Sequence, residues 1–134
     1  RDQNLESRVT FLGFVQPEEL KEITLKADIG VNLLKNKGLN YYYSLANKFF
    51  DYIQASKPSL NMAFPEYQNI VSVHEVGVLL PDLAPQTIQK AVKSLQEEKE
   101  YKRIQQNCLL ARDVFTWEQE ELKLIAFYET VFNK

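Results

Sequence analysis

Short apolar runs alternate with helical patterns along this chain, and that alternation restricts the fold more than any other feature. The runs 9–15, 29–34, 59–63 and 77–80 each have the length of a buried strand and end at turn-forming or polar residues. Strands that alternate with helices through short connections form parallel sheets with right-handed crossovers. We therefore expect an α/β fold with a Rossmann-like open parallel sheet and helices on both of its faces.

The segments between and after these runs carry the apolar spacing of helices. Proline is tolerated in the first turn of a helix, and acidic side chains favour that end because of the helix dipole. The helix expected after the run 29–34 should end before Pro58, since proline disfavours helical geometry at the preceding residue. Helices are expected to begin at Pro17, near Ser44, at Pro65 and at Pro85. From Pro85 to its end the chain is expected to be helical, and Thr116 is the expected N-cap of the last helix.

The expected helix after Ser44 has one apolar and one polar face. At about 100° per residue, Asn47 and Asp51 lie opposite an apolar face, which comprises Leu45, Phe49, Tyr52 and Ile53. The apolar face must pack, so the polar face is left toward solvent or a cleft. Backbone N–H groups in the first turn suit a phosphate, and a carboxylate one turn further can accept hydrogen bonds from sugar hydroxyls. The pattern is typical of a nucleotide-sugar site, but a helix with a polar outer face after a strand is also the commonest element of any α/β protein, so the spacing alone does not decide between them.

Composition restricts the classes of function. The chain has 134 residues, enough for one domain with a substantial core, and a net charge of −2 gives no basic footprint for nucleic acid. The single cysteine, Cys108, cannot form an internal disulfide and is predicted to pack inside a helix. The single histidine, His74, has no second histidine or nearby cysteine, so a zinc site is not expected. No apolar run reaches the length of about 18 residues needed to span a membrane.

The segment 44–58 resembles the donor-site segment of GT-B glycosyltransferases of the family 4 type (glycosyltransferase group 1). Its residues are Ser-Leu-Ala-Asn-Lys-Phe-Phe-Asp-Tyr-Ile-Gln-Ala-Ser-Lys-Pro, where the family's usual form is Ser-Leu-Pro-Asn-Lys-Leu-Phe-Glu-Tyr-Met-Ala-Ala-Gly-Lys-Pro. Further pieces follow the family's order, namely 9–15, Glu19-Leu20, 27–31, 76–80 and Trp117-Glu118.

The resemblance implies transfer of a hexose from a nucleotide diphosphate sugar to an acceptor, generally with retention of anomeric configuration and without a bound metal or cofactor. It assigns the ribose hydroxyls to Asp51 and names no catalytic residue. It places the donor diphosphate against Tyr43, Ser44, Leu45, Ala46, Asn47 and Lys48, and borders the donor pocket with Gly13, Phe14 and Glu66.

Departures from the family pattern weaken this assignment in places. The family often has two glutamates separated by seven residues, and Tyr43 and Asp51 stand at those positions. Asp51 keeps a carboxylate, but Tyr43 does not, so the role of the first glutamate near the transferred sugar is in doubt. Lys48 could balance the diphosphate, although an ion pair with Asp51 is the favoured interpretation. A non-catalytic Rossmann-like nucleotide-binding or interaction module is the alternative.

The resemblance also implies that residues 1–134 are a single partial domain, the C-terminal part of a donor-binding domain. The acceptor-binding N-terminal domain, expected as a partner, and the upstream basic residues that grip the diphosphate are absent, so the chain alone is expected to be inactive. The last helix would then expose the apolar side of 117–132.

The whole enzyme is expected in the cytoplasm, peripherally associated with the inner face of the membrane, in polysaccharide synthesis. A receiver-like or flavodoxin-like domain remains open, but 35–37 is Lys-Asn-Lys, without the acidic cluster of a receiver.

Overall fold

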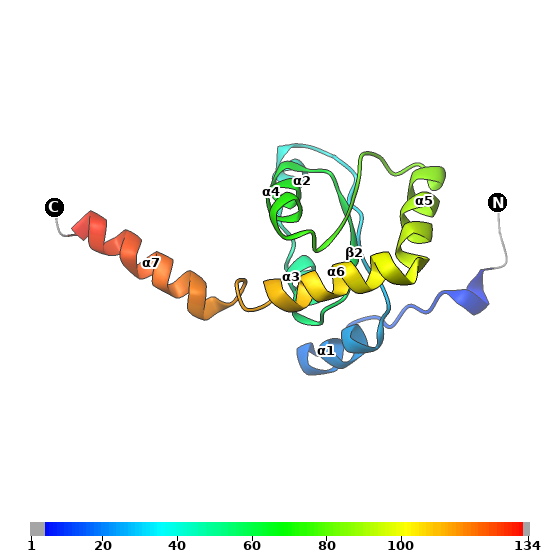
Figure 1. The fold of residues 1–134 in the computed structure, drawn as a ribbon, viewed down its shortest axis with the longest axis horizontal. Coiled ribbons are helices and arrows are strands. Elements are labelled where there is room, and N and C mark those ends of the chain that lie inside the picture. The colour runs from blue at the N-terminus through cyan, green and yellow to red at the C-terminus, as the bar shows by residue number, and fades with distance from the viewer. Residues whose placement is uncertain (1–4, 133–134) are drawn as a thin grey trace.

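The computed structural model describes residues 5–132 and shows an α/β fold around a three-stranded, open parallel sheet (Figure 1). The strands β1 (Gly30–Asn32), β2 (Ser59–Met62) and β3 (Gly77–Leu80) lie side by side in sequence order. Ser59 of the central strand lies beside Gly30 on one side and Gly77 on the other. The expectation of a Rossmann-like α/β fold with an open parallel sheet is therefore confirmed.

Helices make up most of the remaining chain. Proline occupies the first turn of α1, α4 and α5, as the sequence predicts, because its missing N–H would have no partner there. The helices are α1 (Pro17–Lys26), α2 (Leu39–Tyr42), α3 (Asn47–Gln54), α4 (Pro65–His74), α5 (Pro85–Gln96), α6 (Glu98–Ala111) and α7 (Trp117–Phe132), preceded by the short 3-10 helix η1 (Glu6–Arg8).

The predicted strand over 9–15 is wrong. This segment is irregular, and Phe11 and Phe14 are 93% and 86% exposed. A strand requires a neighbour to accept and donate its backbone hydrogen bonds, and no strand among residues 5–132 pairs with it. The strand predicted over 29–34 does form, but only from Gly30 to Asn32.

The core lies where α3 and α4 pack against the sheet and against α6, while α5 packs on β3 and α6. Its fully buried side chains include Phe49 and Ile53 of α3 and Tyr67 of α4. On β1 only one face is covered, because Gly30 lies under the Tyr52 ring whereas Val31, on the other face, is 51% exposed. At this strand, within residues 5–132, the expected burial of both faces is not found.

A row of buried polar side chains crosses the covered face of the sheet. Asn32 donates its Nδ2–H to Asn61 Oδ1 at 3.2 Å, and Asn61 Nδ2 donates to Ser59 Oγ at 2.9 Å. Asn32 Oδ1 has no hydrogen-bond partner among the described residues. The bond between Asn32 and Asn61 joins β1 to β2 and holds their register, since a slip of one residue would bury the amides without partners.

Cys108 packs in the core as predicted, and it gives the fold a measurable pH dependence. Burial raises the pKa of its thiol from 9.0 to about 12. The folded chain therefore holds the proton more tightly than the unfolded chain, so this stabilisation is complete below pH 9 and is lost as the pH rises toward 12. Between pH 8 and pH 10.5 the wild type should lose about 2 kcal/mol more than Cys108→Ala, at ~1.4 kcal/mol per pH unit above 9.

Urea unfolding of both proteins at the two pH values, under reducing conditions, measures this difference. The alanine variant also removes the Sγ contact to the Val76 carbonyl oxygen at 3.3 Å, but that loss is the same at both pH values. Parallel pH dependences of the two proteins would show that the thiol is accessible to solvent.

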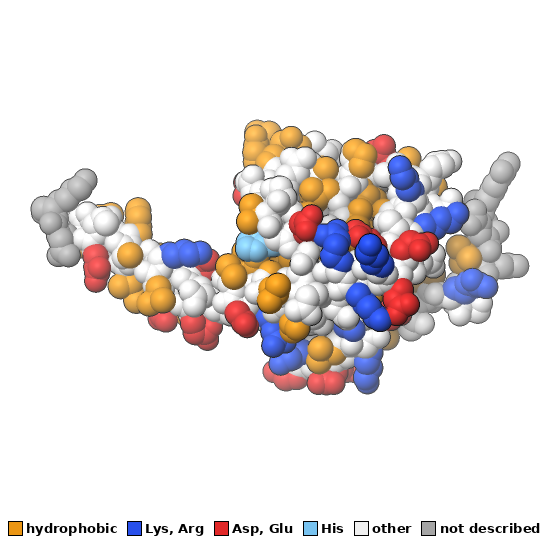
Figure 2. All heavy atoms as spheres, in the orientation of Figure 1, with side chains coloured by type: hydrophobic (Ala, Val, Ile, Leu, Met, Phe, Trp, Pro, Cys, Tyr) orange, Lys and Arg blue, Asp and Glu red, His pale blue; other side chains and the backbone are white. Residues whose placement is uncertain are grey.

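Helix α7 extends away from the rest of the domain, and no residue in it is buried (Figure 1). Hydrophobic side chains lie along its surface among the acidic ones (Figure 2). The expected exposure of the apolar side of 117–132 is therefore confirmed. Within residues 5–132, no helix combines the length and the hydrophobicity that crossing a bilayer requires.

Candidate functional site

Helix α3 begins later than the sequence predicts. Its N-cap is Ala46 and its first residue is Asn47, so the predicted N-cap role of Ser44 is wrong. The reason is a competing turn, because the short helix α2 ends at Tyr42 and Ser44 donates its Oγ–H back to the Tyr41 carbonyl at 2.8 Å. A serine hydroxyl can stabilise either arrangement, and local contacts decide between them.

The two faces of α3 are divided as expected. Phe49 and Ile53 are fully buried, while Asn47 and Asp51 are exposed on the opposite side. Tyr52 lies at the boundary, where its ring covers Gly30 and its hydroxyl donates to the Val31 carbonyl at 3.2 Å. Packing of the apolar face therefore fixes the direction in which Asp51 points.

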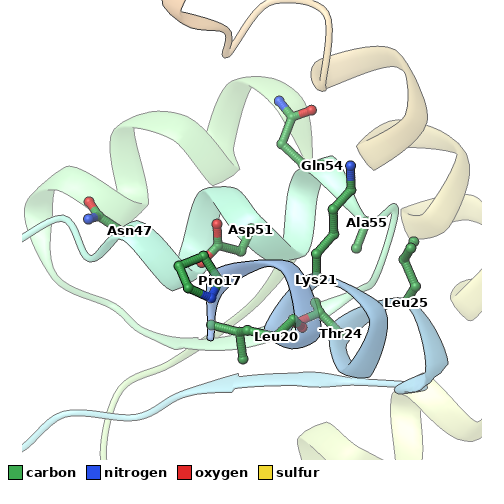
Figure 3. Close-up of a pocket in the computed structure, with 9 residues that line it drawn as sticks. All are labelled: Pro17, Leu20, Lys21, Thr24, Leu25, Asn47, Asp51, Gln54 and Ala55. Carbon is green, nitrogen blue, oxygen red and sulfur yellow. The ribbon is translucent and has the colours of Figure 1, made fainter. Parts of the chain in front are cut away.

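A cavity of about 580 Å³ lies between α1 and α3 (Figure 3). Its size falls within the range of small-molecule sites, about 300–1,000 Å³. Asp51 and Asn47 belong to its wall on α3. The complete lining is Pro17, Leu20, Lys21, Thr24 and Leu25 from α1, with Asn47, Asp51, Gln54 and Ala55 from α3 and its C-terminal end.

The charge of Asp51 is partly shielded from water. Partial burial raises the pKa of its carboxyl group above the usual value. The ion pair predicted between Lys48 and Asp51 is wrong, since none of the ion pairs formed within residues 5–132 joins them. The entropy lost by ordering a long exposed lysine side chain outweighs a weak surface attraction. Asp51 is thus left able to accept hydrogen bonds from a ligand.

The turn that enters α3 is only partly available to an anion. The N–H of Ala46 donates to Tyr67 Oη at 2.9 Å, so this predicted diphosphate donor already has a partner within the protein. The N–H groups of Asn47 and Lys48 lie in the first turn of α3, where the helix itself offers no carbonyl four residues earlier to accept their hydrogen bonds. The helix dipole adds a positive partial charge at the same end.

The remaining residues assigned to the donor site lie outside the cavity lining. Tyr43 is 57% exposed, with its ring edge-on to Tyr42 at 5.0 Å between centroids. Phe14 projects from the irregular segment before α1, and Glu66 lies in the first turn of α4. Other predicted residues that do not line the cavity are Gly13, Ser44, Leu45, Ala46 and Lys48.

Sequence reasoning missed most of the cavity wall. Gln54 follows Asp51 by three residues, so helical spacing could have placed it on the same face. The α1 residues, such as Leu20 and Lys21, reach the site only through tertiary packing, and no local pattern signals that. No group of three His, Cys, Asp or Glu side chains that could hold a metal ion is found within residues 5–132.

No protein-family model, curated protein or solved structure matches this chain.

Proposed function

We propose that this chain is the nucleotide-sugar donor-binding domain of a glycosyltransferase, and that the cavity between α1 and α3 receives the nucleoside. The observation that carries the proposal is the position of Asn47 and Asp51. The family resemblance assigns both residues to a donor site, and both line one cavity of about 580 Å³. A nucleoside is a ligand of suitable size for such a site.

The chemistry of the cavity wall suits a nucleoside. Pro17, Leu20 and Leu25 provide apolar surface on α1 for a planar base, and Asp51 provides a carboxylate on α3 for ribose hydroxyls (Figure 3). Partial burial raises the pKa of that carboxyl group above its usual value. A charge-assisted hydrogen bond formed there is stronger than a bond between neutral groups.

The diphosphate would lie at the first turn of α3, next to Asn47 of the same cavity. The amides of Asn47 and Lys48 and the helix dipole would stabilise the negative charge that develops on the leaving diphosphate. Lys48, which has no ion pair with Asp51, would add its ammonium group. The acceptor and the remaining diphosphate ligands belong to other parts of a longer protein, so the isolated chain should bind nucleotide without transferring sugar.

Calorimetric titration with UDP, GDP, ADP, CDP and dTDP tests this proposal. One of them should bind the wild type, and Asp51→Asn should weaken that binding about 10- to 100-fold, since hydrogen bonds to a charged group contribute about 1.5–3 kcal/mol. Asp113→Asn is the matched control, because Asp113 is an exposed aspartate outside the cavity. Absence of binding by all five nucleotides, or equal binding by Asp51→Asn, would refute the assignment.

A nucleotide-binding module without turnover is the second candidate, and Tyr43 favours it. The family has a glutamate at that position, near the transferred sugar, and an exposed tyrosine cannot act as a carboxylate. If the longer protein binds a nucleoside diphosphate but transfers no sugar until Tyr43→Glu is introduced, the second candidate is correct.

A further inference from the structure

Gln54 lines the cavity and also bonds the segment that leads into α7. Its side chain lines the cavity on α3 (Figure 3), and its Nε2 group donates to the carbonyl oxygens of Arg112 and Phe115, each at 2.9 Å. These two carbonyls lie in segment 112–116, which connects α6 to α7. Both hydrogens of one amide group are therefore used to hold this connection.

The rest of the connection rests on few contacts. The Phe115 ring lies 5.6 Å from Phe50 and 5.0 Å from His74, measured between centroids. Helix α7 has no buried residue of its own, so its direction depends on how segment 112–116 is held. Removing the two Gln54 bonds would leave mainly the Phe115 ring to fix the start of α7.

We propose that Gln54 couples occupation of the cavity to the position of α7. A ligand in the cavity that bonds to the Gln54 amide, or that turns this side chain toward itself, takes the amide hydrogens away from the two carbonyls and so loosens segment 112–116. By thermodynamic linkage, a contact that fixes α7 must in turn alter the affinity of the cavity. The coupling depends on the Gln54 amide and not on the identity of the ligand, so it goes beyond the proposed function.

The first test removes the amide. Val114 and Phe115 donate their N–H groups to the Ala111 carbonyl at 3.0 and 3.2 Å, and their hydrogen exchange reports the order of the connection. Gln54→Glu keeps the shape but cannot donate, and it should speed this exchange about five- to tenfold. Gln106→Ala, an exposed glutamine on α6, is the control and should leave it unchanged. Unchanged exchange in Gln54→Glu overturns the proposal.

The second test fills the cavity without any nucleotide. Lys21 lines the cavity from α1, and Figure 3 shows its side chain running toward the part of α3 that carries Gln54. N-ethylmaleimide should label Lys21→Cys selectively, because Cys108 is buried and its raised pKa keeps the thiol protonated. Leu25→Cys gives a second attachment point on the same wall.

Labelling at either point should speed exchange of the Val114 and Phe115 amides several-fold, while exchange in the buried part of α6 stays the same. Combined with Gln54→Glu, labelling should add nothing further. The proposal is overturned if both labels leave the exchange unchanged, or if they act equally with and without Gln54. Because no nucleotide is used, a failure of nucleotide binding does not decide this test.

Discussion

Phe49→Ala is expected to lower the free energy of unfolding by about 3–5 kcal/mol, the range typical of deleting a buried phenylalanine side chain. Phe49 is fully buried on α3 and packs edge-on against Tyr67 of α4 at 5.3 Å and against Phe50 at 5.5 Å. The loss combines the transfer of apolar surface with the cavity that the rigid neighbours cannot close. Domains of this size have a total stability of about 5–15 kcal/mol, so the variant should be close to its folding limit.

Urea unfolding followed by circular dichroism at 222 nm measures the effect. Phe14→Ala is the matched control, because it makes the same chemical change at a side chain that is 86% exposed. It should shift stability by less than about 0.5 kcal/mol. Equal losses in the two variants would mean that segment 9–15 is packed, and that its description as an exposed irregular segment is incorrect.

Local sequence signals correctly predicted most of the element positions. Proline at the first turn placed the starts of α1, α4 and α5, and the apolar run 77–80 matched β3. The helical spacing of Phe49 and Ile53 correctly identified the buried face of α3. These predictions succeeded because the deciding interactions lie within a few residues of each other along the chain.

The failures occurred where distant segments decide the structure. An apolar run such as 9–15 forms a strand only if another strand lies beside it. The run 29–34 includes Asn32, which is buried because Asn61 of a neighbouring strand accepts its hydrogen bond. The predicted helix start at Ser44 failed because Ser44 bonds instead to the Tyr41 carbonyl three residues earlier, a competition that propensities do not resolve.

The candidate site was predicted in the same partial way. The direction of Asp51 followed from helical spacing, but the cavity it lines requires α1 to pack against α3, and the sequence does not specify that contact. The occupied state of the Ala46 amide depends on Tyr67, a residue 21 positions away. Sequence patterns therefore identified residues that point outward, whereas the structure determined which of them meet.

Gly77→Ala is expected to cost about 2–3 kcal/mol, more than a surface glycine should. A Cβ atom at position 77 would lie 2.5 Å from the Ser59 carbonyl oxygen, which belongs to the backbone of the neighbouring strand β2. Such a contact is too short to persist, so β2 and β3 must move apart or shift. Urea unfolding should show the loss. Gly13→Ala meets no atom within 4 Å and carries only the strain of its left-handed φ of +69°, so it should cost less, about 1 kcal/mol.

Second-site changes distinguish this mechanism from general sensitivity of the sheet. Gly30→Ala also creates a clash, at 2.4 Å, but with the ring of Tyr52, so Tyr52→Ala should relieve part of its cost. The obstruction at Gly77 is a carbonyl group that no substitution removes, although the Ser59 hydroxyl lies 3.0 Å away. Ser59→Ala should therefore fail to rescue Gly77→Ala. Full rescue would show that the hydroxyl, and not the strand backbone, excludes a side chain at this position.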